Sequence, residues 1–114
     1  MPQITVDYSA GLGDRIDRPA LAGALHAAAV EHVAARTAAC KTRFRRADAT
    51  VAGEAAADLV HVEIALLAGR TEEAKAALAD AVLAALPGHI EAPEGVHLSA
   101  EVRDLEPAYR SAIA

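Results

Sequence analysis

The sequence predicts an α+β fold in which two β-α-β units form a four-stranded mixed sheet with two helices on one face. Four segments alternate between polar and apolar residues, as half-buried strands do, and two segments repeat apolar residues at the spacing of a helix face. These segments follow one another as strand, helix, strand, twice over. Because 114 residues suffice for one core but not for two, we expect residues 1–114 to form a single domain.

The first unit opens with a strand almost at the start of the chain. Residues 3–8 alternate between polar and apolar side chains, and Gly11 and Gly13 end the pattern. Asp17 is a suitable N-cap for the helix that follows, and Pro19 is tolerated in its first turn. The apolar stripe of this helix consists of Leu21, Leu25, Ala28, Ala29 and Val33.

The second strand of this unit is predicted over residues 41–51, where the period of two returns. One of its faces carries Thr42 and Phe44. The other face carries the three cations Lys41, Arg43 and Arg45. Residues 52–56 break the pattern, so we expect the strand to have ended there.

The second unit repeats the same order of elements. Residues 60–66 alternate between aliphatic and polar residues, which predicts a strand that Gly69 closes. Thr71 is positioned to cap the next helix, whose apolar stripe runs through residues 74–85. The Pro-Gly pair at 87–88 is typical of a helix end.

The last strand is predicted over residues 96–102, before a loosely held tail that contains Pro107 and Tyr109. Both helices then cover the apolar face of the sheet, and the opposite face is polar. That polar face is either solvated or packed against neighbouring copies. The residues available to pair across such an interface include His61, Glu63, Ser99 and Glu101.

Composition excludes several classes of function. A net charge of −5 and a pI near 5.4 argue against general nucleic-acid binding, which needs a basic surface. The single cysteine, Cys40, excludes an internal disulfide and a cysteine-based zinc site. We find neither a secretory signal nor an apolar run long enough to span a membrane, so we expect a cytoplasmic protein. The low aromatic content, 3%, favours additional burial through oligomerisation.

The five histidines do not have the spacing of metal ligands, since His26 and His32 are six residues apart on a helix and the others are scattered. No metal site is expected. The sequence also contains no nucleophile elbow, Walker-type phosphate loop or dinucleotide fingerprint.

Pro2 is the most informative position. Removal of Met1 would expose a secondary amine at the start of a strand, where the sheet holds it rigidly. Such an amine is a good general base only if burial or nearby cations lower its pKa, so that it is neutral near pH 7. The simpler alternative is an ordinary second residue, because Met-Pro is a common start.

The cations of the second strand favour the catalytic interpretation. Like charges aligned along a strand repel each other, and a site for a dianionic substrate would explain Lys41, Arg43 and Arg45. Arg70, at the junction after Gly69, is suited to hold a carboxylate bidentately. The alternative is a solvated edge strand whose charges discourage edge pairing.

Taken together, these features resemble the 5-carboxymethyl-2-hydroxymuconate delta-isomerase family of the tautomerase superfamily, from Pro2 to about Pro107. The resemblance is in the order and spacing of Met1-Pro2 before a strand, Lys41-Thr42-Arg43-Phe44-Arg45, Val60-His61-Val62, Gly69-Arg70-Thr71-Glu72-Glu73 and the last strand with Leu105-Glu106-Pro107.

The resemblance implies a tautomerase-like homotrimer that requires no cofactor or metal. Pro2 would be the general base and then the acid that moves a proton within an unsaturated dicarboxylate during homoprotocatechuate breakdown. Arg43 and Arg70 would bind substrate carboxylates, together with Lys41 and Arg45. Lys41 stands where the family can have arginine, and lysine lacks the planar fork of a guanidinium.

Two other functions remain open. A proline-based hydratase or dehalogenase would need a carboxylate to activate water, for which Asp48, Glu63 and Glu101 are candidates by residue type alone. A non-catalytic trimeric binding protein, related to macrophage migration inhibitory factor, would have the same fold. Retention of Met1 would favour that second alternative, because an acylated proline nitrogen is an amide and not a base.

Overall fold

The computed structural model describes residues 1–114 as one four-stranded sheet, two long helices and a small hairpin. The elements in chain order are β1 (Gln3–Ser9), η1 (Ala10–Arg15), α1 (Arg18–Val33), η2 (Thr37–Ala39), β2 (Lys41–Ala47), β3 (Val51–Ala52), β4 (Ala55–Ala56), β5 (Leu59–Leu66), α2 (Glu72–Ala85), η3 (Leu86–His89) and β6 (His97–Asp104).

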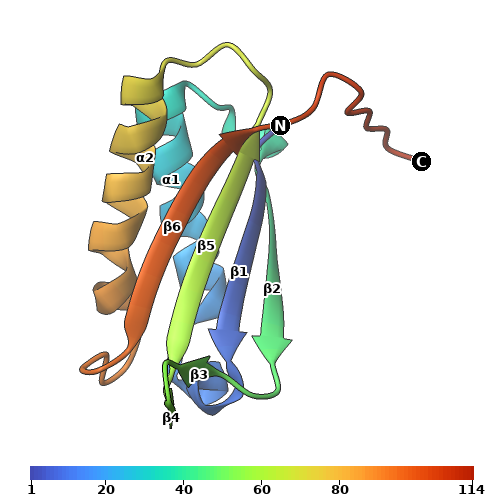
Figure 1. Cartoon of the computed structure of the whole chain (residues 1–114). Helices are drawn as coiled ribbons and strands as arrows, with labels where there is room; N and C mark the ends of the chain where they lie inside the picture. Colours follow the sequence, from blue (N-terminus) through green and yellow to red (C-terminus); the bar gives the residue numbers. More distant parts are fainter.

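The main sheet has the strand order β2-β1-β5-β6. β1 runs parallel to β2 and β5 runs parallel to β6, while the central pair β1 and β5 is antiparallel. Each parallel pair is joined by one helix, and both helices lie on the same face of the sheet (Figure 1). This confirms the predicted α+β fold with two β-α-β units and a mixed sheet.

The core lies between the sheet and the two helices and is almost entirely aliphatic. On β5, Val60, Val62, Ile64 and Leu66 are all buried, as the alternation predicted. The helices contribute fully buried leucines, among them Leu25 and Leu78. Tyr8 is the one aromatic side chain among the buried residues. Neither helix has the length and apolar character that a membrane span requires.

The two helices begin where the sequence predicted. Asp17 Oδ1 accepts a hydrogen bond from the Ala20 amide at 3.1 Å, and Thr71 Oγ1 accepts one from the Ala74 amide at 3.1 Å. Each cap satisfies a backbone donor that has no partner inside its helix. The Pro-Gly pair at 87–88 does not end the helical segment abruptly, because α2 continues into the short 3-10 turn η3.

The second strand is shorter than predicted. It ends at Ala47 rather than at Val51, because its partner β1 ends at Ser9 and the last paired residues are Ser9 and Ala47. The chain then forms the hairpin of β3 and β4. Ser9 holds this hairpin through its Oγ, which lies 2.8 Å from Thr50 Oγ1 and accepts a hydrogen bond from the Leu59 amide at 2.7 Å.

The face of the sheet away from the helices is polar, as predicted, and much of it is paired within the chain. Arg45 binds Asp7 across β2 and β1, and Arg103 binds Glu63 across β6 and β5. Further cross-strand contacts join His61 Nδ1 to Ser99 Oγ at 2.6 Å and Arg43 Nη1 to Thr5 Oγ1 at 3.4 Å.

We predict that Leu78→Ala lowers the free energy of unfolding by about 2–5 kcal/mol, because it leaves a cavity at a fully buried position of α2. Denaturant unfolding followed by circular dichroism measures this loss. The matched control is Leu83→Ala on the same helix, where the side chain is 41% exposed and the expected change is only about 0.5 kcal/mol. Equal losses in the two variants would contradict the assigned packing of α2.

Candidate functional site

The candidate site is a hollow of about 430 Å³ at the end of the sheet where β1 begins. Four segments meet there: the start of the chain, the connection from α1 to β2, the connection from β5 to α2, and the carboxy-terminal tail. The lining residues are Met1, Pro2, Ala34, Ala35, Arg36, Ala38, Ala39, Lys41, Leu67, Arg70 and Ile113. The two ends of the chain thus lie at the same end of the molecule (Figure 1).

Backbone hydrogen bonds fix Pro2 in this hollow. The Pro2 carbonyl accepts a hydrogen bond from the Lys41 amide at 3.0 Å, immediately before the first paired residues of β1 and β2. The Met1 ammonium donates to the Ala39 carbonyl at 2.8 Å. Pro2 itself is buried. The sheet therefore holds residue 2 in one position rather than letting the start of the chain fray.

A left-handed residue returns the chain from α1 to this site. Ala34 ends α1 with φ of +56° and ψ of +33°, a conformation that terminates helices and is uncommon for a residue with a side chain. The chain then reverses through η2 into β2. This connection delivers Arg36 and Lys41 to the end of the sheet where Pro2 lies.

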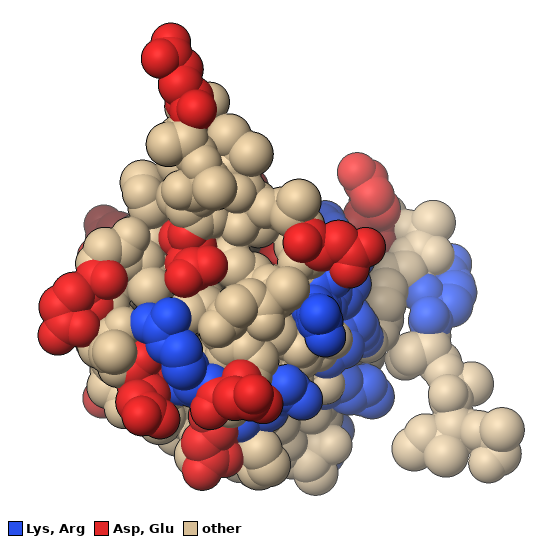
Figure 2. All heavy atoms as spheres, turned by 90° about the horizontal axis from the view of Figure 1, so that it is seen from below, with Lys and Arg blue, Asp and Glu red and all other residues tan.

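The hollow is electrostatically distinct from the rest of the molecule. Three of its lining residues are cations, Arg36, Lys41 and Arg70, and none is acidic. The chain nevertheless has 16 Asp and Glu against 11 Lys and Arg. At the opposite end of the sheet, acidic side chains are spread over the surface with basic side chains between them (Figure 2). A hollow with this lining is suited to bind an anion.

The same environment alters the amino-terminal amine. Burial lowers the pKa of the Met1 ammonium below its ordinary value, and the charge of Lys41 lowers it further, followed by Arg36 and Arg70. Cys40 acts in the opposite direction. An amine at this point of the structure therefore loses its proton more readily than an exposed one.

Two of the predicted site residues lie beside Pro2. Arg70 donates from Nε to the Val33 carbonyl at 3.2 Å and from Nη1 to the Leu67 carbonyl at 3.2 Å, which positions its guanidinium at the hollow. Lys41 Nζ donates to the Ala39 carbonyl at 3.2 Å. The structure thus brings Pro2, Lys41 and Arg70 together.

The other two predicted residues, Arg43 and Arg45, do not line the hollow. Alternate residues of a strand are roughly 7 Å apart, so each successive cation of β2 lies farther from Pro2. Arg43 donates to Thr5 Oγ1 at 3.4 Å and to the Gln3 side-chain oxygen. Arg45 makes a two-bond contact with Asp7, at 2.9 and 3.2 Å. Both are engaged on the polar face of the sheet.

Arg36 was not predicted from the sequence. It lies in an irregular connection that has no hydrophobic period, so pattern analysis does not single it out. A topological signal was present, however. In a β-α-β unit with parallel strands, the connection that enters the second strand lies beside the start of the first strand. A basic residue shortly before Lys41 is therefore placed near Pro2.

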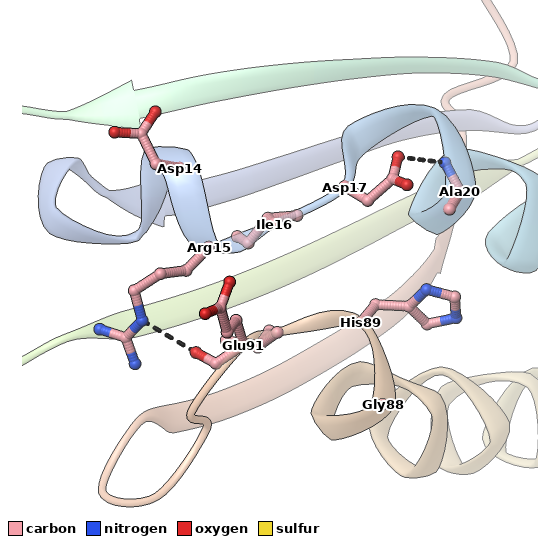
Figure 3. A pocket seen from close by; sticks show the side chains of 9 residues that line it. Asp14, Arg15, Ile16, Asp17, Ala20, Gly88, His89 and Glu91 are labelled. Atoms are coloured by element: carbon pink, nitrogen blue, oxygen red, sulfur yellow. Dashed lines mark hydrogen bonds between the residues drawn. The ribbon is translucent and has the colours of Figure 1, made fainter.

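A second hollow, of about 510 Å³, lies between η1 and η3 (Figure 3). Although it is larger, two of its charged side chains, Arg15 and Asp17, are already engaged in contacts that stabilise the fold. Arg15 donates from Nε to the Glu91 carbonyl at 2.9 Å and lies 3.6 Å from Asp58, while Asp17 caps α1. No three His, Cys, Asp or Glu side chains in the structure are grouped to hold a metal ion. We therefore assign the candidate site to the hollow around Pro2.

Comparison with known proteins shows the family of the chain. The sequence profile of the family described as 5-carboxymethyl-2-hydroxymuconate isomerase matches residues 2–112. No match was found among curated protein sequences.

Several solved structures share the fold of this chain. A 5-carboxymethyl-2-hydroxymuconate isomerase from Deinococcus radiodurans R1 is 25% identical, with a TM-score of 0.81 over 98% of this chain and 88% of the other. A structure described as a Q0 fused 4-OT wild type symmetric trimer is 28% identical, with a TM-score of 0.75 over 96% and 90%. A macrophage migration inhibitory factor-like protein from Entamoeba histolytica shares the fold at 14% identity, with a TM-score of 0.73 over 98% and 95%.

We predict that Lys41→Met raises the pKa of the amino-terminal amine toward its ordinary value, because it removes the charge that lowers that pKa most. The change is measured by an NMR titration of the amino terminus. The control is Arg46→Met, because Arg46 lies near the far end of β2 and does not line the hollow. An unchanged or lower pKa in Lys41→Met would contradict the electrostatic description of the hollow.

Proposed function

The chain belongs to the 5-carboxymethyl-2-hydroxymuconate isomerase family and is an isomerase, and from that premise we propose that it moves a proton within an unsaturated 2-hydroxy/2-oxo dicarboxylic acid, with Pro2 as the base. The observation that supports this most is the lining of the hollow. Residue 2 lies among three cations and no carboxylate, in a chain of net charge −5. That environment suits both a dianionic substrate and an amine of low pKa.

The proposal requires the removal of Met1. While Met1 is attached, the Pro2 nitrogen is part of an amide and is not basic. Initiator methionine is normally removed when a small residue such as proline follows it. The new secondary amine would then lie in the buried position of Pro2, close to the cations that lower the pKa of the amino terminus in the intact chain.

In the proposed reaction, the neutral Pro2 amine accepts the proton of the 2-hydroxyl group of the dienol. The oxygen electrons form the carbonyl at that carbon, and the conjugated double bonds shift. The protonated amine then returns the proton to a remote carbon, so that substrate and product are isomers and no cofactor is consumed. Negative charge develops on the substrate during this transfer, and the three cations of the hollow stabilise it.

We assign the binding roles by position. Arg70 holds a substrate carboxylate, because two backbone carbonyls already orient its guanidinium. Lys41 contributes a point charge beside Pro2. Arg43 and Arg45 complete the expected set of binding residues. We propose that Arg43, whose partners Thr5 and Gln3 are neutral, acts through its charge, whereas Arg45 would have to release Asp7 before it could bind a carboxylate.

The proposed substrate is 5-carboxymethyl-2-hydroxymuconate or a close relative, an intermediate of homoprotocatechuate breakdown. We also propose a homotrimer. The polar face of the sheet offers a surface for packing between copies, and one of the structural relatives is described as a symmetric trimer. We place the reaction in the cytoplasm, where the lone Cys40 would stay reduced.

We predict that the purified protein lacks Met1, that it catalyses ketonisation of 2-hydroxymuconate and its carboxymethyl derivative, and that Pro2→Ala reduces kcat/KM by roughly 10²- to 10⁴-fold, the usual contribution of a general base. Intact mass and ultraviolet absorbance measure these properties. If Met1 is retained, or if wild type and Pro2→Ala are equally inert, the chain is better described as a binding protein of the same fold.

We further predict that Arg70→Lys raises KM by about 10- to 100-fold, because lysine retains the charge but not the fork that binds a carboxylate with two hydrogen bonds. Steady-state kinetics with the carboxymethyl substrate measures the effect. Arg46→Lys, outside the hollow, serves as the control and should leave KM unchanged. The role of Arg70 is refuted if the KM of Arg70→Lys equals the KM of Arg46→Lys.

A further inference from the structure

We propose that Arg36 is a specificity-determining residue, whose guanidinium binds the second carboxylate of a dicarboxylate and makes the hollow select dianions over monoanions. The proposal rests on the proposed function, since it names the group that recognises the substrate class of the same site.

Arg36 is the one cation of the hollow whose side chain is unengaged. Arg70 already donates to two backbone carbonyls, and Lys41 donates to the Ala39 carbonyl. The Arg36 guanidinium makes neither a hydrogen bond nor an ion pair within the chain. All five of its N–H donors are therefore available to an incoming anion.

The backbone that carries this side chain is firmly held. The Arg36 carbonyl accepts a hydrogen bond from the Ala39 amide at 2.9 Å and another from the Cys40 thiol, with the sulfur at 3.5 Å. The preceding residue, Ala35, is buried and donates to the Ala29 carbonyl at 3.3 Å. A free guanidinium on a fixed anchor can bind a ligand without ordering the backbone, which reduces the entropic cost of binding.

The lining of the hollow leaves Arg36 without a partner inside the site. None of the lining residues is acidic, although the chain as a whole is. Arg36 and Arg70 also enter from different connections, α1 to β2 and β5 to α2. Two guanidinium groups from separate segments match two carboxylates at separate ends of one ligand, whereas Lys41 offers only a point charge.

The test compares two ligands of equal length that differ in one carboxylate. Dissociation constants of adipate and hexanoate are measured by calorimetry for wild type, Arg36→Gln and Arg46→Gln. The control residue, Arg46, is an exposed arginine on β2 outside the hollow, so both variants lose the same charge. Thermal unfolding followed by circular dichroism verifies that each variant is folded.

We expect wild type to bind adipate more tightly than hexanoate. Arg36→Gln should weaken adipate binding by about 10- to 100-fold, the loss of a charge-assisted contact, and should change hexanoate binding less than about 3-fold. Arg46→Gln should leave both constants close to those of wild type. Arg36→Lys, which keeps the charge without the fork, should recover only part of the preference for adipate.

The proposal is overturned if wild type does not bind adipate more tightly than hexanoate, or if Arg36→Gln weakens the binding of both ligands equally. It is also overturned if the dissociation constants of Arg36→Gln equal those of Arg46→Gln. These results do not depend on turnover. Failure of the proposed function would instead appear as full activity in Pro2→Ala or as the absence of isomerase activity, and the adipate preference would still decide the role of Arg36.

Discussion

The parallel pairing of β1 with β2 is the constraint on which the site depends. Parallel strands begin at the same edge of a sheet, and their connection must cross back along it, here through α1. The hydrogen bond from the Lys41 amide to the Pro2 carbonyl lies at this edge. It brings the start of the chain and the connection out of α1 together. Without this pairing, nothing would place Arg36 and Lys41 near Pro2.

The second consequence of this topology is a separation of charge. Acidic residues outnumber basic ones in the chain, yet all the charged side chains that line the hollow around Pro2 are cationic. The parallel edge supplies Arg36 and Lys41, and the turn after β5 supplies Arg70. Burial lowers the pKa of the amino-terminal amine, and the cations gathered beside it lower that pKa further and also attract an anionic ligand. The same cations thus contribute both to the low pKa of the amine and to the recognition of the substrate.

Much of the fold could be predicted because its signals are local. Alternation located the strands, and Asp17 and Thr71 were identified as helix caps from residue type and position alone. The length of β2 could not be predicted in this way. It depends on where the partner strand stops, at Ser9, which is a property of the pairing and not of residues 41–51.

The site shows the same limit. Alternation placed Lys41, Arg43 and Arg45 correctly on one face of β2, but it does not say how far each lies from Pro2 along the strand. Arg36 was not predicted because irregular segments have no hydrophobic period. Its position follows from the topology of the sheet. Sequence pattern thus identifies the face of an element, whereas depth and proximity come from how the elements are paired.

The most direct test of this account is the pH dependence of kcat/KM for the protein without Met1. If a neutral Pro2 amine is the base, kcat/KM should rise with pH through a single pKa, below that of an exposed secondary amine, and then level off. An NMR titration of the Pro2 nitrogen should give the same pKa. A rate that is independent of pH across that range, or a Pro2 pKa at its ordinary value, would contradict the central claim that the cationic hollow makes Pro2 the catalytic base.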